Sequence, residues 1–151
     1  MVEFTLVAPI VIALGFGAGE FGRAIQHYHT VNKSTRDAAR FLARVPVTCP
    51  SGGGSGSVDD AADVTRAKSL AMTGYAGGGT PIIDYWTDAS TVTVSVDCYD
   101  NSAGTFRKYS EIARIEVAVA LPYQDMGFLD LLGVSGTITF HVDHQEIHIG
   151  E

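Results

Sequence analysis

The first twenty residues of this 151-residue chain contain no basic side chain, and the whole chain contains only two cysteines. A cleaved secretory signal needs a basic segment before its apolar run and small residues after it. Here no Lys or Arg precedes Phe4, and the sequence EFGR follows the run, which argues against such a signal. The chain also lacks Gly-Lys-Ser/Thr, Gly-x-Ser-x-Gly and Cys-x-x-Cys motifs. Their absence argues against a phosphate-binding loop, a serine hydrolase elbow and a zinc or dithiol site.

Positive charge is scarce beyond the N-terminal third. Residues 46–151 carry five basic and fourteen acidic side chains, whereas residues 1–45 carry five basic and three acidic ones. Proteins that bind nucleic acid neutralise phosphates with clustered Lys and Arg. The acidic balance of residues 46–151 therefore argues against nucleic acid as a partner. Because the motifs named above are missing, we also expect no small-molecule substrate, no cofactor and no enzymatic activity.

An uncharged apolar run, FTLVAPIVIALGFGAG, occupies residues 4–19. Sixteen residues are close to the lower limit for crossing a bilayer as a helix. A buried core helix and a cleaved signal remain alternatives, but a membrane-inserted helix explains the length and lack of charge best. Its predicted lipid-facing residues are Phe4, Leu6, Val7, Pro9, Ile10, Leu14 and Phe16.

The helical pattern continues beyond the apolar run. Apolar residues recur at spacings of three and four, which is typical of one helix face. Pro46 and Pro50 end the pattern, so one helix of about residues 2–43 is predicted. We expect residues 1–45 to form this helix and residues 46–151 a globular domain. The predicted buried face comprises Phe21, Ala24, Ile25, Tyr28, Val31, Thr35, Ala38, Ala39 and Leu42.

Glu3 places a carboxylate next to the apolar run. An ionisable residue inside a membrane segment is costly and is by default a candidate functional site. In a filament of packed helices, the N-terminal amine of a neighbouring subunit could neutralise Glu3. The alternative is that Glu3 only marks the membrane edge.

Several segments resemble one protein family. VEFTLVAP at residues 2–9 resembles the VEFALVLP opening of TadE-like pseudopilins of the tight-adherence (Flp) pilus system. EFGRA at residues 20–24 and STRDAAR at residues 34–40 resemble the family's following segments. Near the C-terminus, VAVALPY at residues 117–123, FLDLLG at residues 128–133 and a last strand ending near Gly150-Glu151 add to the similarity.

The resemblance implies a non-enzymatic, single-pass protein of the cytoplasmic membrane with an exoplasmic C-terminal domain, which either stays in the membrane or enters an extracellular pilus. It implies other pilin subunits, membrane lipid, a prepilin peptidase and the pilus assembly machinery as partners. It assigns Glu3 and Phe4 to processing and subunit assembly. The peptidase of this family cuts four residues before the glutamate, so the cut is expected two residues upstream of Met1.

The cysteines and the remaining pattern predict a small α+β domain. In an exported domain, Cys49 and Cys98 are expected to form one disulfide, with two buried free thiols as the alternative. Residues 51–57 are predicted to be a flexible loop, and a short helix is predicted from Ala61 to about Met72. Alternating strands are predicted at residues 91–99, 111–121 and 137–149, and Ile82–Trp86 is a candidate short edge strand. The expected fold is pilin-like α+β, with the long helix packed on three to four antiparallel strands.

Two polar clusters are candidate ligand sites. His141 and Asp143 share one strand face, while His144 and His148 share the other, so alternation separates them and no metal site is predicted. Asp97, Asp100, Asn101 and Gly104 form an acidic turn that lacks the twelve-residue calcium loop of an EF-hand. Two rivals to the pilus subunit remain: a permanently anchored exoplasmic binding module, and an exported hydrolase that uses the histidine-rich last strand.

Overall fold

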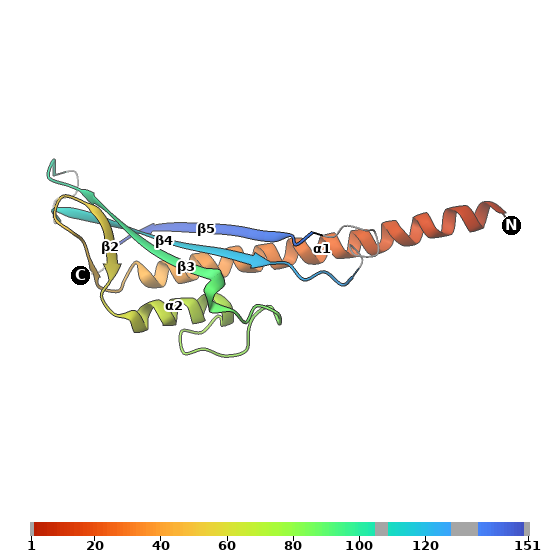
Figure 1. Ribbon diagram of the computed structural model, residues 1–151, viewed down its shortest axis with the longest axis horizontal. Helices are drawn as coiled ribbons and strands as arrows, with labels where there is room; N and C mark the ends of the chain where they lie inside the picture. Colours follow the sequence, from red (N-terminus) through yellow and green to blue (C-terminus); the bar gives the residue numbers. More distant parts are fainter. Residues whose placement is uncertain (1, 105–108, 128–135, 150–151) are drawn as a thin grey trace.

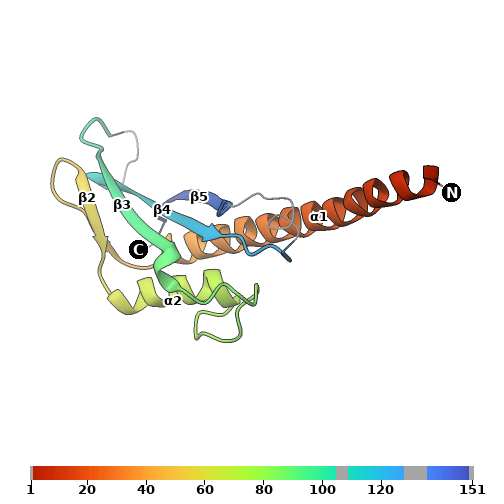
Figure 2. The same cartoon turned by 45° about the vertical axis from the view of Figure 1, so that its right-hand side comes forward.

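A computed structural model describes residues 2–104, 109–127 and 136–149, with side chains from Thr5 onward. One long helix, α1 (Val2–Leu42), runs through the whole molecule, and Pro9 lies inside it. The prediction of a single helix over the apolar and amphipathic segments is confirmed. Its N-terminal half extends away from the domain, and its C-terminal half lies along the sheet (Figures 1 and 2).

The sheet has five antiparallel strands in the order β1-β2-β3-β4-β5. Its long strands are β3 (Val92–Asp100), β4 (Glu111–Pro122) and β5 (Thr139–Ile147). The strands β1 (Val47–Thr48) and β2 (Gly54–Val58) extend it beyond β3. The register pairs Val94 with Val117, so the alternating valines of β3 and β4 share the inner face.

Helix α1 and the shorter α2 (Ala61–Thr73) form the second layer against this inner face. Alternation along β3 and β4 places their buried apolar residues toward the helices and their more exposed residues toward solvent. The described fold is therefore α+β and pilin-like, as predicted. Among the described residues, its largest fully buried side chains are Val31, Thr35, Leu42, Trp86, Val92, Ile115, Val117 and Val119.

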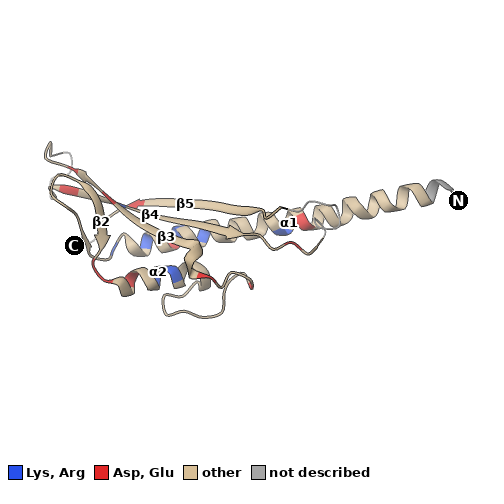
Figure 3. Ribbon diagram, in the orientation of Figure 1, with Lys and Arg blue, Asp and Glu red and all other residues tan. Residues whose placement is uncertain are grey.

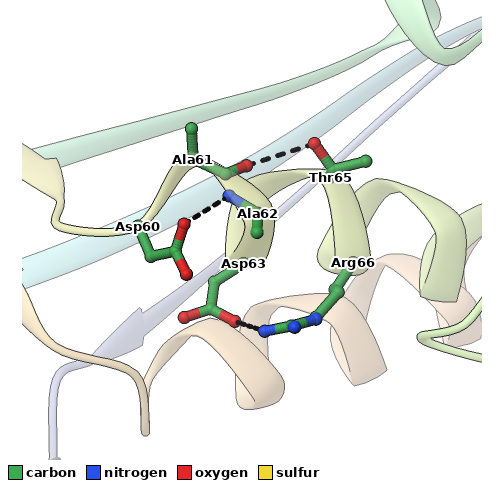
Figure 4. A network of polar contacts seen from close by, with 6 residues as sticks. All are labelled: Asp60, Ala61, Ala62, Asp63, Thr65 and Arg66. Carbon is green, nitrogen blue, oxygen red and sulfur yellow. Dashed lines mark hydrogen bonds and ion pairs between the residues drawn. The ribbon is translucent and has the colours of Figure 1, made fainter.

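Helix α2 has matched signals at both ends. The Asp60 carboxylate accepts a hydrogen bond of 2.8 Å from the Ala62 N–H and caps the N-terminus. Asp63 pairs with Arg66 one turn later at 2.7 Å, and both contacts are visible in Figure 4. Gly74 ends the helix with φ of 77°, and its N–H donates to the Leu70 carbonyl. The predicted helix is thus confirmed.

Two predictions about the sheet were wrong. The glycine-rich segment 51–57 is not simply a loop, because Gly54–Val58 forms β2 and pairs with both β1 and β3. The extra strands make five rather than three to four. Ile82–Trp86 forms no strand; instead Trp86 is fully buried, and its Nε1–H donates to the Thr91 hydroxyl at 2.8 Å.

The predicted buried face of α1 was wrong at its beginning. From Val31 to Leu42 the predicted residues are buried, but Phe21, Ile25 and Tyr28 are exposed. The apolar periodicity of α1 begins at Phe21, but the domain covers this face of the helix only from Val31 onward. Helical periodicity shows which residues share a face, but only the position of the sheet decides where that face is covered.

Candidate functional site: the exposed half of the long helix and its junction with the domain

The N-terminal half of α1 exposes large apolar side chains. Leu6 and Leu14 are 67% and 69% exposed, and contiguous exposed apolar surface of this kind marks a membrane or protein interaction site. The helix is long and apolar enough to cross a membrane, and a signal sequence near an N-terminus shares these properties. Other predicted lipid-facing residues that are exposed are Val7, Pro9, Ile10 and Phe16.

Glu3 and Phe4 lie in the first turns of α1. Their side chains lie outside the part of the chain that the structure describes. The role predicted for them therefore stays a prediction.

A buried carboxylate occupies the junction between the exposed half of α1 and the domain. Glu20 is only 4% exposed. The Tyr123 hydroxyl, just beyond β4, donates to Glu20 Oε1, and the Met126 N–H donates to Oε2 at 3.3 Å. A buried carboxylate requires such donors, because an unsatisfied buried charge is strongly destabilising. Glu20 therefore ties the segment after β4 to the helix.

Aromatic rings surround this junction. The His27 ring lies 5.6 Å from the Tyr85 ring and 6.0 Å from the Tyr123 ring, measured between centroids. His27 Nδ1 and the Tyr85 hydroxyl share a hydrogen bond of 3.0 Å. Phe140 of β5 contacts both Tyr123 and Tyr28. Residues from α1, the segment before η1 (Ala89–Thr91), the end of β4 and β5 thus meet at one level of the helix.

Burial changes the acid–base properties of this cluster. It raises the pKa of Tyr123 well above its ordinary value, and the hydrogen bond to the Glu20 carboxylate adds to the shift. Burial also lowers the pKa of His27, with a further contribution from the nearby Arg23 guanidinium. Both shifts favour the uncharged form of the ring concerned.

Sequence reasoning did not single out Glu20 and Tyr123 as partners. A carboxylate directly after an apolar run was the available signal, because such a group needs a partner or water. The partner lies 103 residues away in the chain, so no local pattern could identify it.

The predicted disulfide is present between Cys49 and Cys98, whose Cα atoms are 5.7 Å apart. Cys49 follows β1, shortly after the end of α1, and Cys98 belongs to β3. The bridge therefore joins the chain leaving the long helix to the middle of the sheet. Such a bond is typical of extracytoplasmic proteins.

The histidine and acidic clusters have ordinary structural partners. His144 lies 3.0 Å from Glu146, whereas His141 is exposed on the opposite face of β5. Asp97 pairs with Arg114 at 2.9 Å, and the Asp100 carboxylate accepts hydrogen bonds from Ser102. Among the described residues, no group of three or more His, Cys, Asp or Glu side chains is arranged to hold a metal ion.

The long helix that is apolar and exposed at one end and packed on an antiparallel sheet at the other defines a pilin-like architecture. Residues 1–40 match the family of TadE-like proteins, so the N-terminal segment of this chain is TadE-like. The match covers the exposed half of α1 and most of its packed half. Comparison with curated proteins and with solved structures gave no match.

Proposed function

We propose that this chain is a TadE-type, pilin-like subunit that is anchored in the membrane by α1 and acts in the assembly or initiation of an Flp (type IV-like) pilus for surface adhesion. The observation that carries the proposal is the exposed apolar half of α1, within a TadE-like segment, continuing without a break into the core of a pilin-like domain. One rigid helix can then serve first as a membrane anchor and later as a packing element between subunits.

In this proposal the C-terminal domain lies on the exoplasmic side of the cytoplasmic membrane, and the disulfide supports that side. The partners are membrane lipid, other pilin or pseudopilin subunits, the prepilin peptidase and the assembly machinery. The role is non-enzymatic, as is typical of TadE-like pilins.

Glu3 and Phe4 are proposed to act in processing and assembly. The Glu3 carboxylate would pair with the N-terminal amine of a neighbouring subunit and so align adjacent helices. This pairing would offset the cost of placing a carboxylate in an apolar bundle.

Processing tests the proposal directly. The gene should be expressed with its upstream DNA and the cognate peptidase, and the membrane form should be analysed by intact mass and N-terminal sequencing. We expect an N-terminus four residues before Glu3. A chain that the peptidase leaves uncut would contradict the proposal.

A permanently anchored exoplasmic adhesion module is the alternative. If the chain is such a module, Glu3→Ala should not affect pilus assembly. If the chain is a pilus subunit, Glu3→Ala should abolish pilus assembly. Asp143→Ala, which removes an exposed carboxylate from the outer face of the sheet, is the matched control and should assemble normally.

A further inference from the structure

The exposed apolar surface of α1 continues past Glu20. Phe21 and Ile25 are 68% and 40% exposed, and Tyr28 completes a stripe with helical spacing of four and three residues. This stripe begins beside the last residues of the apolar run. The exposed polar residues Gln26 and His29 lie on either side of Tyr28 in the sequence, where the stripe ends.

Apolar residues of the domain are exposed at the same level. Met126 is 63% exposed, and its backbone N–H donates to Glu20, which places it beside the junction. Ile138, 45% exposed, is held beside Tyr123, whose N–H donates to the Ile138 carbonyl at 2.7 Å. We call Phe21, Ile25, Met126 and Ile138 the junction collar.

The burial of Glu20 removes the only carboxylate between Glu3 and Asp37 from the surface of α1. Figure 3 shows an acidic and a basic band next to each other on α1, where the uncharged half of the helix ends. The basic neighbour Arg23 is half-buried, and a long guanidinium side chain at a membrane boundary can extend its charge to water. Neither charge therefore interrupts the exposed apolar stripe.

The length of the stripe fits a bilayer better than the uncharged run alone. Sixteen residues of helix span about 24 Å, less than the roughly 30 Å of a hydrocarbon core. The helix segment from Thr5 to Ile25, which comprises the exposed apolar run and the first two residues of the stripe, spans about 32 Å on the same geometry. The segment beyond Gly19 presents an apolar surface because Phe21 and Ile25 are exposed, while the contact with Tyr123 holds the Glu20 carboxylate inside the protein.

We propose that the bilayer surface lies at the level of Ile25 rather than Gly19, and that the junction collar contacts the interfacial region of the phospholipid bilayer. The continuity of the collar with the apolar half of α1 favours lipid as its occupant. This inference rests on the proposed membrane anchoring. The Glu20–Tyr123 hydrogen bond keeps the carboxylate turned into the protein, so that the domain can sit directly on the membrane.

Depth-dependent fluorescence quenching tests this placement. Full-length protein with Leu14→Cys, Ile25→Cys, Met126→Cys or Ala103→Cys would be labelled with a fluorophore without reductant, so that the Cys49–Cys98 bridge stays closed. The labelled proteins would be reconstituted into phosphatidylcholine–phosphatidylglycerol vesicles. Quenchers would be lipids that carry a spin label either near the headgroup or near the bilayer centre.

We expect lipids labelled at the bilayer centre to quench the fluorophore at position 14, and lipids labelled near the headgroup to quench the fluorophores at positions 25 and 126. Neither lipid should quench the fluorophore at position 103, in the exposed turn after β3. If the fluorophore at position 14 is quenched while those at positions 25 and 126 behave like the one at position 103, membrane anchoring by α1 is supported and the collar proposal is wrong. If Leu14 is also unquenched, the anchoring proposal fails. Loss of quenching at Ile25 and Met126 as the protein-to-lipid ratio rises would assign the collar to a second copy and overturn lipid contact.

A matched pair of variants tests the contribution of the Glu20 contact. Tyr123→Phe, in the Ile25→Cys protein, removes one donor to the buried carboxylate and should reduce quenching by the headgroup-labelled lipid. Tyr75→Phe alters an exposed tyrosine and should leave quenching unchanged. Retained near-ultraviolet circular dichroism would show that Tyr123→Phe is folded, and unchanged quenching in that folded variant would contradict the role given to the contact.

Discussion

His27 shows how one side chain at the junction makes stability depend on pH. Its ring lies 5.6 Å from the Tyr85 ring and 6.0 Å from the Tyr123 ring, measured between centroids, and Arg23 lies on the same helix. Burial and the Arg23 charge lower its pKa, while Glu20 and Asp84 oppose the shift more weakly. In the unfolded chain His27 regains a pKa of about 6.5.

The unfolded chain therefore binds a proton more readily than the folded one between these two pKa values. Stability contributed by neutral His27 is fully present above about pH 6.5 and is lost as pH falls toward the folded pKa. We expect His27→Gln to reduce the difference in melting temperature between about pH 7.5 and about pH 5.5. Thermal unfolding of the detergent-solubilised protein would measure it. His141→Gln, at an exposed position, should retain the difference, and equal behaviour of the two variants would argue against the assignment.

At the scale of elements, the sequence predicted α1 and the three long strands because each carries its own period. Apolar residues at spacings of three and four indicate a helix, and alternating valines indicate a strand with one buried face. Strand β2 has neither signal. Its sequence, GSGSV, forms a strand because β1 and β3 supply backbone partners on both sides.

Gly56 allows β2 to pack closely between β1 and β3, because its neighbours leave no room for a side chain. A Cβ at Gly56 would lie 2.6 Å from Cys98 Sγ and 2.9 Å from the Thr48 carbonyl oxygen, closer than real Cβ contacts allow. We expect Gly56→Ala to lower the free energy of unfolding by about 1–3 kcal/mol through overpacking. Chemical denaturation of the oxidised protein would measure it. Gly77→Ala, which has open space around the added methyl group, is the control, and equal stability of the two variants would contradict close packing at β2.

At the scale of the whole molecule, apolar surface and charge are separated along α1. The N-terminal half is uncharged from Thr5 to Gly19, and the basic residues of the helix begin at Arg23 (Figure 3). A chain with this distribution should partition into membranes through its N-terminal half alone. The acidic domain contributes no comparable apolar stretch among its described helices.

Leu14→Arg tests this partition. A charged side chain near the centre of a membrane helix costs about 2.5–3.5 kcal/mol on insertion scales. Because the apolar run is short, we expect the variant to leave the membrane fraction after an alkaline wash, measured by immunoblotting. Tyr75→Arg places the same charge at an exposed position in the domain and should remain with the membrane. Equal retention of both variants would argue against insertion of α1.

The sequence by itself determined the elements whose side chains repeat with a period: the long helix, the three long strands and the capped helix α2. It also indicated the disulfide, because two cysteines in an exported domain are expected to pair. Only the tertiary structure decided that the predicted apolar face of α1 is buried from Val31 rather than from Phe21, that a glycine-rich segment pairs as β2, and that Glu20 contacts Tyr123. These outcomes depend on contacts between segments far apart in the chain, and local periodicity carries no information about such contacts.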